Sequence, residues 1–138
     1  MERGKIAHLY RAKSDESFQA ARICFERKLF RATCNRSWYS TMQIITAGVY
    51  QELDLVPQSK DLNFSHMSQS RIYKELCRSA RMRSYEDLAT LIAQALERRN
   101  EADYGVDTAL TEDMAKRSLS TADQIRKVVY KIVGPAWQ

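Results

Sequence analysis

The sequence predicts an all-α fold, an antiparallel up-and-down bundle of about five helices. Apolar residues recur every three or four positions through most of the chain, as on one face of a helix. No segment shows the sustained alternation of apolar and polar residues that is typical of a strand. Only four glycines and two prolines occur among 138 residues, so long helices with few turns are expected. A chain of this length is expected to form one domain.

The first two expected helices cover about 6–28 and 31–53. The second is apolar around much of its circumference, which predicts a central element or one that also faces a partner chain. Small residues at positions 46–48 favour close approach of a neighbouring helix. Its apolar stripe consists of Trp38, Met42, Ile45, Val49 and Leu53.

Cap residues divide the second half of the chain into three further helices. After a long loop at about 54–65, Ser65 is expected to cap a helix over 66–82, and Ser84 the next one. Thr111 is expected to cap the last helix, which Gly134 and Pro135 end. The final three residues, 136–138, are expected to form a short tail.

Composition excludes several classes of site. With two histidines and no CxxC pair among three cysteines, neither a zinc site nor a disulfide framework is indicated, and no metal or other cofactor is expected. The glycines are isolated, so no phosphate-binding loop is present. No apolar run approaches membrane-spanning length, which favours a soluble cytoplasmic protein. The net charge of +5 is compatible with a nucleic-acid partner and equally with solvated lysines and arginines.

The stretch 96–105 carries more polar side chains than a helix end requires. Arg99 and Asp103 are four residues apart and can form an ion pair on one helix face. One interpretation is structural, with an internal ion pair and a packed Tyr104 ring. The other is a phosphate-binding helix end, with Arg98 and Arg99 as donors.

Three other places could contribute to a site. His66 follows Ser65 at a loop-to-helix junction, where it could be a partly buried histidine or a proton donor in a groove. Arg36, near Trp38 and Tyr39, could stack on aromatic rings or hold phosphate, although a solvated arginine is the simpler interpretation. The arginines and lysine between positions 71 and 83 would form an electrostatic groove only if they shared a side with Arg98 and Arg99.

Four motifs in this order resemble those of HEPN-domain proteins, small helical nucleotide- and RNA-associated proteins of prokaryotes. They span the whole chain, which would then be a single HEPN-like domain over 1–138. The matching stretches are Ile6, Leu9, Arg11 and Ala12 in the first helix, Asn35-Arg36-Ser37-Trp38-Tyr39-Ser40, Phe64-Ser65-His66, and Arg99-x-x-x-Asp103-Tyr104.

The resemblance implies a homodimeric helical bundle that acts with a nucleotidyltransferase-type partner as a toxin–antitoxin or stress-defence pair. Many members are metal-independent ribonucleases with a motif of arginine, a polar residue and, after a few more residues, histidine. Arg99 and Asn100 match its beginning, whereas Tyr104 stands in the place of the histidine. A phenol is a poor acid–base catalyst at neutral pH, so the resemblance implies the scaffold and the anion-binding arginine more strongly than RNA cleavage.

The function that we expect is therefore RNA or nucleotide binding with a degenerate ribonuclease motif. One alternative is an active endoribonuclease toxin in which Arg99 acts with His66 or Tyr104, and another is a structural subunit without catalysis. The expected catalytic residues are Arg99, Tyr104 and His66, and the expected binding residues are Arg36, Tyr39, Arg98, Asn100 and Asp103.

Overall fold

The computed structural model describes residues 1–138 and confirms the all-α prediction, with five α-helices and no strand. None of the helices combines the length and the apolar character needed to cross a membrane. Three short 3₁₀ helices lie beside the α-helices. The elements are α1 (Arg3–Glu26), α2 (Phe30–Glu52), η1 (His66–Ser68), α3 (Gln69–Ser79), η2 (Arg83–Leu88), α4 (Ala89–Tyr104), α5 (Glu112–Val133) and η3 (Gly134–Trp137).

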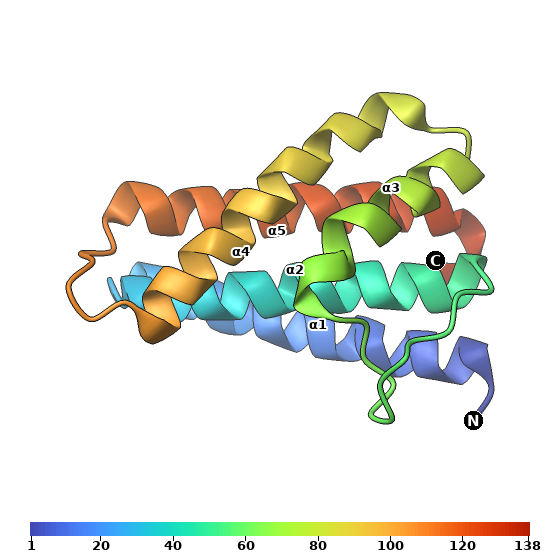
Figure 1. Ribbon diagram of the computed structural model, residues 1–138, viewed down its shortest axis with the longest axis horizontal. Helices are drawn as coiled ribbons and strands as arrows, with labels where there is room; N and C mark the ends of the chain where they lie inside the picture. The colour runs from blue at the N-terminus through green and yellow to red at the C-terminus, as the bar shows by residue number, and fades with distance from the viewer.

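Helix α2 is the centre of the bundle, because every other α-helix packs against it. In Figure 1, α1, α2 and α5 lie lengthwise, while α4 crosses them obliquely and α3 covers the same face. The chain reverses direction between α1 and α2, between α3 and α4, and between α4 and α5. The long loop at 53–65 instead returns the chain to the middle of the bundle, so α3 runs toward the same end as α2 (Figure 1).

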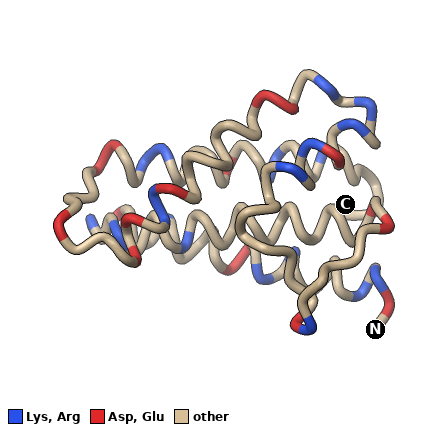
Figure 2. Tube along the Cα trace, viewed as in Figure 1, with Lys and Arg blue, Asp and Glu red and all other residues tan.

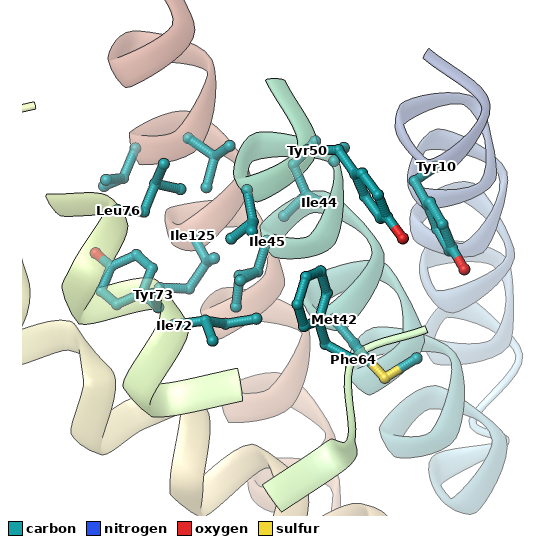
Figure 3. Close-up of a cluster of buried hydrophobic side chains, with 14 of the residues drawn as sticks. Tyr10, Met42, Ile44, Ile45, Tyr50, Phe64, Ile72, Tyr73, Leu76 and Ile125 are labelled. Carbon is teal, nitrogen blue, oxygen red and sulfur yellow. The ribbon is translucent and has the colours of Figure 1, made fainter. Parts of the chain in front are cut away.

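The core confirms the expected stripe of α2, since Trp38, Ile45 and Val49 are fully buried. Side chains from α2, α3, α5 and the long loop meet there, as Figure 3 shows. A Cβ atom on Gly48 would lie 2.7 Å from Cγ1 of Val129 and 2.9 Å from Cδ2 of Leu76. The absence of a side chain at Gly48 therefore lets α3 and α5 pack directly on the backbone of α2.

Thr111 caps α5 as expected, whereas Ser65 caps the 3₁₀ helix η1, which leads into α3 at Gln69, and α3 ends at Ser79 rather than near 82. The Ser65 hydroxyl accepts a hydrogen bond from Ser68 N at 3.2 Å, and the Thr111 hydroxyl accepts one from Met114 N at 3.2 Å. The prediction for Ser84 is wrong, because it lies inside η2 and α4 begins only at Ala89. Contacts with α3 hold this segment in a 3₁₀ turn: the Tyr73 hydroxyl donates to Tyr85 O at 2.8 Å.

The C-terminal residues do not form the expected tail. Trp137 is 92% buried, since only 8% of its surface is exposed, and it lies at the end of η3. Arg11 of α1 donates to Trp137 O at 3.3 Å, and its Cζ lies 5.5 Å from the Trp137 ring centroid. The aromatic side chain therefore closes the end of the bundle where both termini lie (Figure 1).

Candidate functional site

The first half of α2 and the last turns of α4 meet at Tyr39 and Arg99. Arg99 Nη2 donates to the Tyr39 hydroxyl at 3.2 Å, and its Cζ lies 5.7 Å from the Tyr39 ring centroid. His66 of η1 meets the same ring edge-on, with the two centroids 5.8 Å apart. Three expected site residues from distant parts of the sequence thus lie together. We call Asn35, Arg36, Tyr39, His66, Arg99 and Asp103 the polar cluster.

Arg99 is held in place from three directions. Its Nε lies 2.9 Å from Oδ2 of Asp103, its Nη1 donates to Oδ1 of Asn100 at 3.1 Å, and its Nη2 donates to Tyr39. The Arg99 side chain is only 13% exposed. A guanidinium has five N–H groups, so one on each terminal nitrogen is still free to meet a ligand. This geometry suits an anion with two acceptor oxygens, such as a phosphate.

The Asp103 carboxylate links α4 back to the start of α2. Asn35 Nδ2 donates to both of its oxygens, at 3.1 Å and 3.0 Å. The side-chain oxygen Oδ1 of Asn35 in turn accepts a hydrogen bond from Arg36 Nε at 2.8 Å. The Arg36 Cζ lies 4.9 Å from the Tyr39 ring centroid, so two guanidinium groups contact this one ring.

His66 has a fixed orientation because Trp38 Nε1 donates to its Nδ1 at 2.8 Å. The two rings also stack, with centroids 5.8 Å apart. Burial, and secondarily the positive charge of Arg99, lowers the pKa of His66 below its ordinary value. The imidazole is therefore neutral at pH 7, and because Nδ1 is an acceptor, its proton is on Nε2.

Tyr104 lies at the exposed rim of the polar cluster. Its side chain is 71% exposed, and its ring centroid is 5.3 Å from the Arg99 Cζ. Tyr104 therefore covers one side of Arg99, and its hydroxyl is accessible from solution. Asn100, which is exposed, also lies at this rim through its bond to Arg99.

Arg98 does not join the polar cluster, although it precedes Arg99 in the sequence. Its Nε donates to the Ser118 hydroxyl of α5 at 2.6 Å. Burial lowers the pKa of Arg98, and the Cys34 thiol lies nearby. Successive residues of a helix point about 100° apart, so Arg98 faces α5 while Arg99 faces α2.

The basic run between positions 71 and 83 is also separate from Arg99. Arg81 precedes η2 and Arg83 begins it, whereas Arg99 lies near the C-terminal end of α4. In Figure 2, basic positions gather before the start of α4 and stand again near its far end. Arg78 pairs with Glu86 of η2 at 2.8 Å. The condition for one shared electrostatic groove is therefore not met for this run as a whole.

A groove of about 780 Å³ adjoins the polar cluster. It lies between the loop 55–65 on one side and η1 with the first turn of α3 on the other. Tyr39 and His66 line the groove and also belong to the polar cluster, so the two features are continuous.

Three residues that hold the candidate site together were not among those expected from the sequence. Asn35 holds Asp103, and Trp38, expected only in the core, orients His66. Arg31 donates to the carbonyl oxygens of Ala102 at 2.9 Å and Gly105 at 3.0 Å, which ties the end of α4 to α2. Asn35 stands beside Arg36 in a motif, but no sequence signal indicated its partner.

No group of three or more His, Cys, Asp or Glu side chains is arranged to hold a metal ion. The side chains of the polar cluster offer instead cationic and hydrogen-bonding donors around aromatic rings. Their chemistry is that of an anion-binding surface with one oriented imidazole N–H.

A comparison of the sequence with protein families identifies the family of this chain. The family model described as HEPN domain matches residues 7–133, which is nearly the whole chain. No curated protein matches the sequence significantly.

Proposed function

The chain belongs to the HEPN domain family, whose functions are broadly related to nucleotides and RNA, and we propose that it binds RNA or a nucleotide through the polar cluster. The phosphate would be held by Arg99, with Arg36 and Tyr39 beside it. His66, Asn100, Asp103 and Tyr104 would complete the surface. Arg98, which faces α5, is left out of this surface.

The observation that carries the proposal is the position of Arg99. Asp103, Asn100 and Tyr39 each hold one of its nitrogens, at 2.9, 3.1 and 3.2 Å. A guanidinium that is fixed before the ligand arrives loses little side-chain entropy on binding. Its two free N–H groups match the fork of two phosphate oxygens.

The binding test measures the affinity of the purified protein for a short single-stranded RNA at several salt concentrations. Arg99→Ala is expected to weaken binding about 10- to 100-fold, the loss of a hydrogen bond to a charged group. The slope of the logarithm of affinity against the logarithm of salt concentration should become less steep by about one unit, the effect of one lost phosphate contact. Arg22→Ala is the matched control, because Arg22 is exposed on α1 and its substitution removes the same charge as Arg99→Ala does. Equal affinity of Arg99→Ala and wild type would refute the proposed site.

We further propose that the protein works as a homodimer with a nucleotidyltransferase-type partner, in a toxin–antitoxin or stress-defence pair. Membership of the HEPN family and the exposed rim formed by Tyr104 and Asn100 support a contact surface at the end of α4. Sedimentation of the purified chain tests the dimer. The neighbouring open reading frame, co-expressed with this chain, tests the partner.

A second candidate is a metal-independent endoribonuclease, and the orientation of His66 favours it. The Nε2–H group of the neutral imidazole can donate a hydrogen bond to a phosphoryl oxygen and stabilise charge that develops there in the transition state, while Arg99 holds the phosphate. Tyr104 stands in the place of the motif histidine, which favours binding without cleavage.

Incubation of the pure protein with total RNA and a chelator separates the two candidates. Cleavage that is lost in both Arg99→Ala and His66→Ala would establish the enzyme. An inert wild type that still binds RNA would establish the binder. A wild type with neither cleavage nor salt-dependent binding would indicate the third candidate, a structural assembly subunit.

A further inference from the structure

The groove beside the polar cluster has the size and the lining of a ligand-binding site. Its volume of about 780 Å³ is within the range of small-molecule sites. Met42, Phe64 and Ile72 form an apolar wall, while Asn63, Ser65 and His66 add hydrogen-bonding groups along it. This mixture fits a flat, partly polar ring such as a nucleobase.

We propose that the groove is the nucleoside subsite of the RNA-binding surface, in which a base lies in the groove while its phosphate lies at Arg99. The inference rests on the proposed function and deepens it. The ligand chemistry is that of a nucleoside phosphate, which could be a free mononucleotide or one unit of a single strand.

The wall of the groove is held in place without a ligand. The Tyr50 hydroxyl donates to Leu62 O at 2.8 Å, and Tyr10 donates to Oδ1 of Asn63 at 2.5 Å. The amide of the fully buried Gln69 donates to Phe64 O at 3.4 Å. These bonds tie the loop to α1, α2 and α3, so that a ligand meets a preformed surface.

The charges of the groove give the bound nucleotide a direction. Asp61 lines the groove, and hydrogen bonds from Ser59 and Asn63 lower the pKa of its carboxyl group, so it is ionised at neutral pH. The carboxylate repels a phosphate and accepts hydrogen bonds from the amino group of a base. The phosphate therefore lies toward Arg99 and His66, and the base lies toward the loop.

Asp61 also predicts a preference among bases. Adenine and cytosine carry an exocyclic amino group that can donate to a carboxylate, whereas uracil does not. A second cation, Arg71, lines the groove and pairs with Glu75 at 3.1 Å. Arg71 can meet the next phosphate of a strand, so a single strand should bind more tightly than a mononucleotide.

The test compares labelled oligo-A, oligo-C and oligo-U of equal length by fluorescence polarisation, with adenosine monophosphate as a competitor. Wild type should bind oligo-A and oligo-C about fivefold more tightly than oligo-U, the effect of one hydrogen bond. Asp61→Asn should remove this difference and still bind all three. Gln58→Trp, which fills the groove from its exposed wall, should weaken oligo-A binding about tenfold, close to the loss of one stacked base.

Gln19→Trp is the matched control, because Gln19 is exposed on α1 and lies outside the groove. Melting curves of all variants establish that they are folded. Unchanged affinity in Gln58→Trp, or equal binding of all three oligonucleotides by wild type, would overturn the groove proposal while Arg99-dependent binding still stands. If Arg99→Ala binds RNA as wild type does, the proposed function itself fails. Full displacement of oligo-A by low concentrations of the mononucleotide would assign the free nucleotide as ligand, and weak displacement would assign the strand.

Discussion

Trp38 Nε1 lies 2.8 Å from His66 Nδ1, and this hydrogen bond joins the buried centre of α2 to the edge of the candidate site. Trp38 is fully buried, whereas His66 is partly exposed beside the groove. The core of the bundle thus determines which imidazole nitrogen faces a ligand.

Replacing Trp38 with phenylalanine should release His66. The variant removes the donor and leaves a small void in the core, so we expect a loss of about 1–3 kcal/mol in the free energy of unfolding. Nitrogen-detected NMR of the imidazole should change from one tautomer to a mixture. Trp137→Phe is the control: it also removes an indole donor, to Gln51 at 3.3 Å, yet should leave the His66 signals unchanged. A single His66 tautomer in Trp38→Phe would contradict the assignment.

The stability of the protein should fall in mild acid because of His66. Burial and Arg99 lower the pKa of His66 in the folded state, while the unfolded chain takes up a proton near pH 6.5. The unfolded state therefore binds more protons below about pH 6.5, and the free energy of unfolding decreases as pH falls through that region. Denaturant titrations at pH 8 and pH 5 should show a smaller difference for His66→Asn than for wild type. His8→Asn, on the exposed face of α1, should behave as wild type does.

Asp103 should increase RNA affinity even though it is negatively charged. Asp103→Ala removes a carboxylate that would repel phosphate, but it also frees Arg99, whose Nε lies 2.9 Å from Oδ2. We expect the loss of a fixed Arg99 side chain to outweigh the removed repulsion, so that affinity falls about fivefold, the size of an ion pair of about 1 kcal/mol. Glu97→Ala, an exposed carboxylate of the same helix, should leave affinity unchanged or raise it. Tighter RNA binding by Asp103→Ala would show that charge repulsion by Asp103 outweighs its role in positioning Arg99.

The two glycines within α-helices, Gly4 and Gly48, provide a matched pair for testing the packing of α2. Gly48→Ala should cost about 1–3 kcal/mol of unfolding free energy, because its Cβ would overlap Val129 and Leu76. Gly4→Ala should be neutral or stabilise by up to about 1 kcal/mol, since an added Cβ would meet no atom within 4 Å apart from the nearby backbone of α1, and alanine favours helix. Chemical denaturation measures both, and equal stabilities would contradict the close packing of α2, α3 and α5.

The helices themselves followed from local patterns. Apolar spacing predicted the five helices, and Ser65 and Thr111 act as the expected caps because a cap depends on neighbours three residues away. The predicted cap at Ser84 was wrong because its segment depends on residues far away in the sequence. Its segment is bonded to α3 through Tyr73 and Arg78, and no local pattern reveals such distant partners.

The candidate site shows the same division. The Arg99–Asp103 pair could be predicted from its spacing of four residues. His66 and Tyr39 were indicated by their local sequence and again by the resemblance to the HEPN family. Arg98 and Arg99 were expected to act together, yet they face different helices. Periodicity places two neighbours on different sides of a helix, but it does not say which side meets α2 and which meets α5.

The sequence by itself determined the all-α class, the apolar character of α2 around most of its circumference and the polar end of α4, because these depend on apolar periodicity and local composition. Only the tertiary structure decided that Asn35 holds Asp103, that Trp38 orients His66 and that a groove opens beside Tyr39. These features require residues far apart in the chain to meet. Their geometry is fixed by how the helices pack and by where the loop returns to α2, and no local pattern contains that information.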